Sequence, residues 1–468
     1  MRLSRSEVLK IRHVRALGFD APSGEWLAGV SIDSRTTQAG DLFIAIRGEK
    51  FDAHDFITRA IGSGAAMVMV DRKWADSNGT MLVSIAVPRL VVEDTIVALG
   101  ELAAFYRAKF RIPILAVAGS NGKTTTKNMI TAVLATKYNV LSTEGNLNNH
   151  IGVPQTLFRL SENHEVGVVE IGTNHFGELE YLCRLLAPTH GLVTNIGREH
   201  LEFFRSLEGV AKAEGELLDY LRKNKGTFFL NKDDAYLAKR AKGTRGLKMV
   251  SFGFRTGESD VRGKFLGSDE FGSGRMTFRQ RGKKESEAQL SVPGEHNARN
   301  ALAAAAVGSA MRVPAKNIVK ALSEFSAAGK RSEIVRLNGV TVLNDSYNAN
   351  PDSVLEALKT LRMIKSAKRR IVVLGDMLEL GKASEKEHRR IGKAMTQHRV
   401  DLLFTFGEYS RLANESAALK VKNHFDNKLA LAEQLANLLA SGDAVLVKGS
   451  RGMKMEEVVN HLQQKFKD

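Results

Sequence analysis

The residues best suited to chemistry lie at positions 112–128, which read IPILAVAGSNGKTTTKN. An apolar run ends in a turn with Gly119 and Gly122, after which Lys123 and three threonines open a helical pattern. Such a turn directs backbone N–H groups toward one point, and the positive end of the helix adds to the attraction of an anion. We therefore predict a phosphate-binding loop in which Lys123 reaches the outer phosphates and the Thr124 hydroxyl binds Mg²⁺.

This loop is the short form, GxxGKT, because Val117 stands where the common nucleotide loop has its first glycine. The alternative is an ordinary Gly-rich turn between a strand and a helix, with a surface lysine. The order of apolar strand, glycines, lysine and threonine favours the phosphate loop. The predicted nucleotide contacts are Gly119, Ser120, Asn121, Gly122, Lys123, Thr124 and Thr125.

Length and composition indicate the number of domains and the class of protein in which this loop lies. The 468 residues predict about three domains, and 43% hydrophobic with 26% charged residues is typical of a soluble globular protein. The single cysteine, Cys183, excludes an intrachain disulfide and suits a reducing cytoplasm. Charges recur every few residues in segment 1–18, which predicts an amphipathic helix and not a signal peptide. We expect a cytoplasmic monomer without membrane insertion.

The formal net charge of +16 permits nucleic acid, a membrane surface or a polyanionic small molecule as partner. The basic residues are spread along the chain, and the densest runs, 365–370 and 382–390, lie among acids or at strand edges. No run interleaves basic with aromatic residues, as proteins that bind single strands do. The pattern favours anionic small substrates and no nucleic acid.

The order of strand-like and helical runs predicts an α/β protein of three domains. Residues 1–92 form a small α/β unit, and residues 93–328 a central domain with a mainly parallel sheet. Within the central domain, residues 252–292 alternate between apolar and polar side chains with glycines between the runs, which predicts an antiparallel portion of the sheet. Residues 329–468 read as a doubly wound, Rossmann-like domain.

Polar residues follow other strands of the predicted central sheet. Glu170 ends the run 166–169, where a carboxylate suits Mg²⁺ and a solvated strand end is the equal alternative. His200 follows a further apolar run, and a structural histidine is the alternative. The polar stretch 143–150 is either a plain turn or a substrate-binding segment, with Asn146, Asn148 and Asn149 as its candidate contacts.

Three polar breaks follow strands of the last domain, at 343–353, 374–381 and 445–456. The carboxyl ends of parallel strands meet at one edge of a sheet, which is where such sheets bind ligands. Any single break reads equally well as a βα turn, whereas three together favour a binding edge. The residues that we expect to bind there are Asp345, Asn348, Lys448 and Arg451.

Together these motifs resemble the Mur ligase family, and within it the MurF branch. The resemblance rests on AGSNGKTTT (118–126), EGNLNNHIGVPQTL (144–157), EIGTNHFGE (170–178), GEHNARNALAA (294–304), NDSYNANPDS (344–353), LGDMLELG (374–381) and KGSRGMKME (448–456). The motifs span all three predicted domains in the order of the family. SYNANP with LGDMLELG separates this branch from its sister ligases.

The resemblance implies an ATP-driven amide ligation in the cytoplasmic stage of peptidoglycan synthesis. The terminal carboxylate of UDP-N-acetylmuramoyl-tripeptide (UDP-MurNAc-tripeptide) would attack the γ-phosphate, and the amine of D-alanyl-D-alanine (D-Ala-D-Ala) would attack the acyl phosphate. By similarity, Glu170 would bind one Mg²⁺ and His200 a second. Asn297 would contact adenine, Arg331 the γ-phosphate and Asp345 the ribose. Ser34 and Arg35 would bind the UDP-sugar, with residues 1–92 as the UDP-substrate domain.

One position departs from the family. Many members carry a lysine, carbamylated to give a carboxylate, in the helix after the histidine. Counting from His200, that position is Glu214, with Lys212 out of register. We hypothesise that the native glutamate supplies the negative charge and binds Mg²⁺ without CO₂.

Two other readings compete with the MurF branch. A different ligase of the superfamily, such as the enzyme that adds the third amino acid or folylpolyglutamate synthetase, disagrees with the C-terminal motifs. A nucleic-acid-dependent ATPase fits the charge, but the loop is short and a second motor motif is absent from the sequence.

Overall fold

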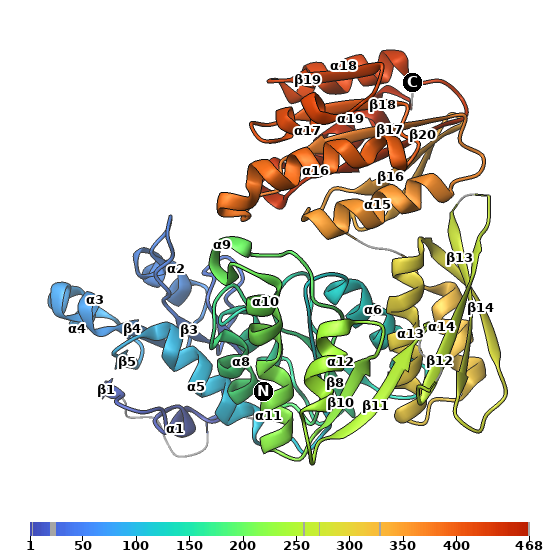
Figure 1. Ribbon diagram of the computed structural model, residues 1–468. Helices are drawn as coiled ribbons and strands as arrows, with labels where there is room; N and C mark the ends of the chain where they lie inside the picture. Colours follow the sequence, from blue (N-terminus) through green and yellow to red (C-terminus); the bar gives the residue numbers. More distant parts are fainter. Residues whose placement is uncertain (2, 19–24, 256–257, 271, 327–328, 467–468) are drawn as a thin grey trace. The chain divides into compact units, whose positions relative to one another are not determined.

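The structure is a computed structural model that describes residues 1–466 except 2, 19–24, 256–257, 271 and 327–328. Its strands form three sheets (Figure 1). By its internal contacts the chain divides into two compact units. The first unit comprises residues 1–116, 139–172 and 178–189, and the second comprises 117–138, 173–177 and 190–468. The predicted domain boundaries after 92 and 328 stay predictions, and residue 328 lies outside the described residues.

The first unit contains a five-stranded sheet with the order β1-β5-β4-β3-β2. Only β1 runs antiparallel to its neighbour. Phe43, Val68 and Trp74 belong to the core that the sheet shares with its helices. The elements are α1 (Arg5–Val8), β1 (Arg15–Leu17), β2 (Val30–Ser31), β3 (Leu42–Ile44), η1 (Ala53–Phe56), α2 (Ile57–Gly62), β4 (Met67–Asp71), α3 (Arg72–Ser77), α4 (Gly79–Ser84) and β5 (Arg89–Val92).

The helix predicted across residues 1–18 is wrong. Helix α1 covers only Arg5–Val8, and Arg15–Leu17 form a strand that pairs with β5. His13 adopts a φ of 55°, which ends any helical run between them. The apolar residues have helical spacing, but pairing with a buried strand overrides this local preference.

The first unit also holds the elements around the polar stretch 143–150. Strands β7 (Val140–Ser142) and β8 (Val166–Glu170) pair in parallel, and all five residues of β8 are buried. A strand buried on both faces reads as a continuous apolar run, which explains the sequence VGVVE. The helices of this part are α5 (Thr95–Arg107), α7 (Gly152–Phe158) and α8 (Glu178–Leu186).

The second unit begins at the end of β6 (Ile114–Ala118) and includes a sheet portion with the order β14-β13-β12-β11-β10-β9. Strands β9 to β12 are parallel, and β12 to β14 are antiparallel hairpins, which confirms the predicted change of character. The strands are β9 (His190–Val193), β10 (Thr227–Asn231), β11 (Lys248–Gly253), β12 (Val261–Ser268), β13 (Ser273–Gln280) and β14 (Ser286–Pro293). The helices are α6 (Lys123–Ala135), α9 (Leu201–Phe204), α10 (Leu207–Glu214), α11 (Glu216–Lys223), α12 (Ala235–Lys242), α13 (Glu295–Ala310) and α14 (Ala315–Glu324).

A six-stranded sheet completes the second unit, with the order β15-β16-β20-β17-β18-β19 and only β15 antiparallel. Adjacent residues of β16, Val342 and Leu343, enter separate hydrophobic clusters, as expected for a sheet covered by helices on both faces. The elements are β15 (Glu333–Leu337), β16 (Val340–Asp345), α15 (Pro351–Met363), β17 (Arg369–Gly375), η2 (Gly381–Ala383), α16 (Ser384–Gln397), β18 (Leu402–Phe406), α17 (Ser410–Ser416), β19 (Val421–Phe425), α18 (Lys428–Leu438), β20 (Asp443–Lys448), η3 (Arg451–Met453) and α19 (Glu456–Lys465). The predicted fold class is confirmed.

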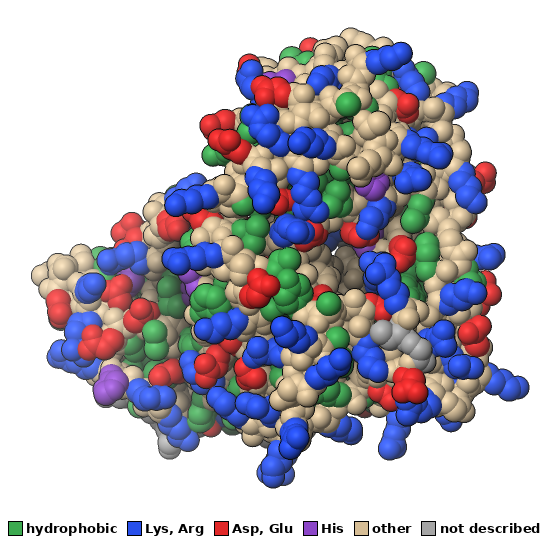
Figure 2. Space-filling model, in the orientation of Figure 1, with side chains coloured by type: hydrophobic (Ala, Val, Ile, Leu, Met, Phe, Trp, Pro, Cys, Tyr) green, Lys and Arg blue, Asp and Glu red, His purple; other side chains and the backbone are tan. Residues whose placement is uncertain are grey.

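The basic residues are spread over the surface as they are along the sequence. Figure 2 shows Lys and Arg side chains scattered over the visible face, with Asp and Glu among them. Among the described residues, no helix is both long and apolar enough to cross a membrane.

Candidate active site

The phosphate loop connects β6 to α6 and is held by the segment that follows β9. The Ser120 N–H donates to the Asn195 carbonyl at 2.9 Å, and the Gly197 N–H donates to the Ser120 hydroxyl at 2.8 Å. Gly119 and Gly122 adopt φ values of 116° and 78°, in the region that glycine alone enters freely. The loop therefore has its shape before any ligand binds.

Gly119 is the position of the loop least able to carry a side chain. A Cβ there would lie 2.3 Å from the Thr194 hydroxyl and 2.6 Å from its backbone nitrogen. Gly119→Ala is expected to lower the free energy of unfolding by about 3 kcal/mol, from backbone strain and overpacking together. Urea unfolding and nucleotide titration measure the effect on stability and binding.

Gly267→Ala is the matched control, because Gly267 has a φ of 106° and open space where its Cβ would lie. It isolates the backbone strain, for which we expect about 1 kcal/mol. Equal losses in the two variants would contradict the steric explanation at Gly119.

Lys123, at the start of α6, is held close to the loop. Its Nζ donates to the Gly119 carbonyl at 2.5 Å and lies 3.3 Å from a carboxylate oxygen of Glu199. The Thr124 side chain next to it is buried, and Thr125 is partly exposed. The ammonium is thus placed where the loop would receive a phosphate.

Two buried carboxylates, of Glu199 and Glu214, accompany this lysine. Burial raises the pKa of Glu214, the nearby charge of Glu199 raises it further, and Lys123 opposes both effects. Glu199 is buried because segment 195–199 packs on the phosphate loop. Lys212 is exposed instead, with its Nζ over the ring of Phe176 at 5.1 Å from the centroid.

Glu170 ends β8 in the first unit, and its side chain is buried. The Asn148 amide donates to Glu170 Oε1 at 2.8 Å, and the Glu170 N–H donates to the Thr143 hydroxyl at 2.9 Å. Asn149 instead accepts from the N–H groups at the start of α7, and Asn146 is exposed. The stretch 143–150 is therefore part turn and part support for Glu170.

His200 stands at the start of α9 in a left-handed conformation, with a φ of 46°. Its Nδ1 lies 2.9 Å from a carboxylate oxygen of Glu379, and the neighbouring His200 lowers the pKa of the Glu379 carboxyl group. A non-glycine residue held in this region of backbone space is often found at a functional site.

The chemistry of these residues fits Mg²⁺. The second carboxylate oxygens of Glu170 and of Glu214 are buried and accept no hydrogen bond within the described residues, a costly state that a cation would relieve. Over the same part of the chain, no three His, Cys, Asp or Glu residues come together as a complete metal site. Mg²⁺ commonly takes one or two carboxylates and completes its shell with water and phosphate oxygens.

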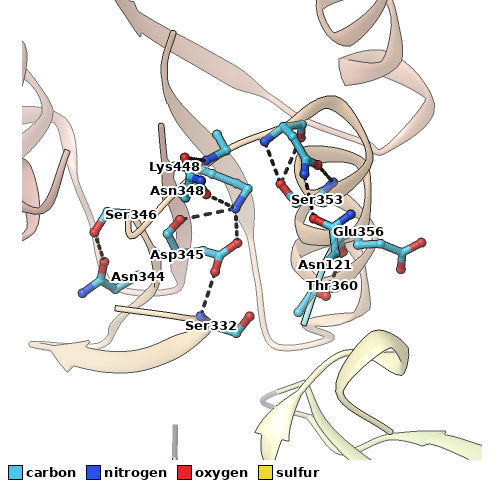
Figure 3. Close-up of polar contacts among 12 residues, drawn as sticks. Asn121, Ser332, Asn344, Asp345, Ser346, Asn348, Ser353, Glu356, Thr360 and Lys448 are labelled. Carbon is cyan, nitrogen blue, oxygen red and sulfur yellow. Dashed lines mark hydrogen bonds and ion pairs between the residues drawn. The ribbon is translucent and has the colours of Figure 1, made fainter. Parts of the chain in front are cut away.

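A second group of predicted residues meets at the edge of the last sheet (Figure 3). The buried Lys448 Nζ lies 2.5 Å from Asp345 Oδ2 and donates to the Asn348 carbonyl at 2.9 Å. The other carboxylate oxygen of Asp345 accepts from the Ser332 N–H at 2.9 Å. Arg451 pairs with Glu456 at 2.9 Å, and its backbone N–H donates to Asn348 Oδ1 at 3.3 Å.

Comparison with known proteins agrees with this arrangement. The chain matches the Mur ligase middle domain over residues 117–308, the Mur ligase glutamate ligase domain over 330–451, and the Mur ligase family catalytic domain over 27–107. The chain belongs to the Mur ligase family.

Relatives within the Mur ligase family extend over nearly the whole chain. UDP-N-acetylmuramoyl-tripeptide–D-alanyl-D-alanine ligase of Escherichia coli is 37% identical over 94% of both chains, and that of Bacillus subtilis is 34% identical over 93% of both. A crystal structure of MurF from Acinetobacter baumannii superposes with a TM-score of 0.88 at 29% identity, covering 98% of both chains. MurF from Thermotoga maritima in complex with ADP gives a TM-score of 0.80 at 25% identity, covering 94% of this chain and 98% of that one.

Asn300, three residues after the predicted Asn297, is a further residue beside the loop that was not predicted from the sequence. The buried Asn297 donates to the Pro293 carbonyl at 2.8 Å and accepts from the Asn300 amide at 3.2 Å. A Cβ on Gly122 would lie 2.7 Å from the Asn300 oxygen, so Asn300 contacts the loop. Its spacing of three residues from Asn297 on a helix was the available signal.

Three predicted residues do not belong to the groups described above, although one of them, Arg331, is adjacent in sequence to a member of the second group. Arg35 is exposed and pairs with Asp33 at 2.6 Å, which lowers the pKa of Asp33 to about 2, and Ser34 beside it is buried. Both lie in the first unit, after β2. Arg331 precedes Ser332, the residue that donates to Asp345. The roles given to all these residues in this Mur ligase stay predictions.

Proposed function

We propose that this chain joins D-Ala-D-Ala to the tripeptide carboxylate of UDP-MurNAc-tripeptide with ATP, in the cytoplasmic synthesis of peptidoglycan. The observation that carries the proposal is the phosphate loop with Lys123 beside two buried carboxylates. Such a site suits a reaction between two anions, which needs charge compensation above all. The printed names of the relatives supply the substrates, and the ADP complex supports a nucleotide in the loop.

Nucleotide binding redirects Lys123. Its ammonium leaves the Gly119 carbonyl and Glu199 for the β- and γ-phosphates, while the N–H groups at the start of α6 receive phosphate oxygens. Asn297 contacts the adenine and Asp345 the ribose. Arg331 stabilises the γ-phosphoryl group as it passes to the tripeptide carboxylate.

The proposed ligands of Mg²⁺ are Thr124 and Glu170 for one ion and His200 for a second, with Glu214 as a further ligand. When bound, the two cations would neutralise phosphate charge and so lower the repulsion that the attacking carboxylate meets. Glu214 takes the place of a carbamylated lysine, and its buried side chain beside Lys123 supports this role better than the exposed Lys212.

The ligation ends when the D-Ala-D-Ala amine attacks the carbonyl of the acyl phosphate and inorganic phosphate leaves. Residues proposed to hold UDP-MurNAc-tripeptide and D-Ala-D-Ala are Ser34 and Arg35, which bind the UDP-sugar, and Asn146, Asn148, Asn149, Asn348, Lys448 and Arg451. Among these, Lys448 acts through Asp345 and Asn348, which its ammonium holds in place.

Phosphate release tests the proposed reaction. With ATP and Mg²⁺, release is expected only when UDP-MurNAc-tripeptide and D-Ala-D-Ala are both present, and mass spectrometry then finds the UDP-MurNAc-pentapeptide. Release with a UDP-dipeptide and a single amino acid would indicate a sister ligase. Stimulation by DNA or RNA alone would overturn the proposal in favour of a nucleic-acid-dependent ATPase.

A further inference from the structure

One guanidinium beside the binding edge of the last sheet is held without a carboxylate. The central carbon of the Arg331 guanidinium lies 3.5 Å from the ring centroid of Tyr347. Within the described part of the chain, the Arg331 side chain makes no ion pair and no hydrogen bond. Both side chains are partly exposed.

The backbone fixes this stacked pair from both sides. The Tyr347 N–H donates to the Lys330 carbonyl at 3.1 Å, and the Ser332 N–H donates to Asp345 at 2.9 Å (Figure 3). These two bonds join the residues on either side of Arg331 to Asp345, the last residue of β16, and to Tyr347, which follows that strand. The stacking therefore follows from the fold of the two segments.

The neighbouring cations differ from Arg331 in having acidic partners. Lys448 pairs with Asp345 at 2.5 Å, and Lys330 and Arg451 both pair with Glu456, at 3.0 and 2.9 Å. Stacking on a ring uses the face of a guanidinium and leaves its N–H donors free in the plane. Arg331 is thus oriented while its charge and donors stay available for an anion.

We infer that Tyr347 is a positioning residue, whose ring holds the Arg331 guanidinium ready for the phosphoryl group that is transferred. The inference rests on the proposed function, in which Arg331 contacts that group. Among the described residues, the Tyr347 hydroxyl makes no hydrogen bond, so the ring is the part that matters. The Arg451 guanidinium, 5.5 Å from the same centroid, is a weaker second cation over this ring.

Substitutions at both positions test the inference in the full-length enzyme. Tyr347→Phe keeps the ring and is expected to retain kcat within about twofold, whereas Tyr347→Leu is expected to lower kcat about tenfold. Arg331→Ala is expected to lower kcat more than 100-fold. The double variant should be no slower than Arg331→Ala, because the ring acts only through Arg331. The KM for D-Ala-D-Ala should change less than twofold throughout.

Phe105→Leu is the matched control, since the Phe105 ring lies under Lys10 and Lys109, at 5.4 and 5.2 Å, in the first unit. It should leave kcat unchanged. Thermal unfolding verifies that each variant is folded, and Tyr347→Met replaces the leucine variant if that one does not fold.

The outcomes separate this inference from the proposed function. Full activity of Arg331→Ala would overturn the role of Arg331 in the proposed function. A slow Arg331→Ala with a fully active Tyr347→Leu would overturn only the inference about Tyr347. Equal losses in the phenylalanine and leucine variants, or losses that multiply in the double variant, would also overturn it.

Discussion

Replacing Lys123 with methionine is expected to lower the rate of phosphate release about 1000-fold at saturating substrates. The substitution keeps the length of the side chain and removes the only charge that the loop itself offers to the transferred phosphoryl group. It also leaves Glu199 and Glu214 without the ammonium that compensates them. We therefore expect the metal-free variant to lose about 3 kcal/mol of stability as well.

Lys137→Met is the control for this substitution. Lys137 follows the end of the same helix, α6, and its exposed ammonium donates to the Arg312 carbonyl at 3.0 Å. Its rate and unfolding midpoint should equal those of the unchanged enzyme. A folded Lys123→Met that keeps more than a tenth of the wild-type rate would contradict the role given to the loop lysine.

Glu214→Gln is expected to change activity and stability in opposite directions. Ligation should fall about 100-fold, because the amide cannot supply the negative charge that the cation needs. The unfolding free energy of the metal-free enzyme should rise by about 1 kcal/mol, because one of two buried neighbouring carboxylates is removed. Thermal unfolding in a chelator and a coupled phosphate assay measure the two effects.

Two further variants separate Glu214 from Lys212. Lys212→Ala should keep activity within twofold and should not respond to bicarbonate, because the side chain of Lys212 is exposed. Glu214→Lys restores the residue type of the family, and its activity should rise with bicarbonate. Full activity of Glu214→Gln, together with a Lys212→Ala that bicarbonate rescues, would show that Lys212 is the carbamylated residue.

The fold class was predictable because its signals are local. Strands such as β8 and β16 are continuous apolar runs that end in polar residues, and their spacing fits alternation with helices. The N-terminal segment was mispredicted for the opposite reason. Whether Arg15–Leu17 is helix or strand depends on β5, more than 70 residues further along the chain.

The parts of the candidate site that could be predicted are those that a single short sequence motif identifies. The loop at 119–125 and Glu170 stand at recognisable strand ends, and His200 lies in the segment between β9 and α9. The burial of Glu199 depends on how the segment after β9 packs against the loop, which no local pattern encodes. The stacking of Tyr347 on Arg331 likewise joins residues from two different segments.

The hydrogen bonds that shape the phosphate loop also limit how many of its backbone N–H groups can bind an anion. The N–H groups of Ser120 and Asn121 are already taken by Asn195, through its carbonyl and its side-chain oxygen. The first helical bond of α6 runs from the Thr126 N–H to the Gly122 carbonyl. Among the described residues of the loop, the backbone donors left for an anion are therefore those of Gly122 and of the first turn of α6, which suffice for about one phosphate group. Side chains therefore have to bind the other phosphates of a triphosphate. Because side chains can change conformation, the last phosphate can be transferred while the hydrogen bonds of the loop stay intact.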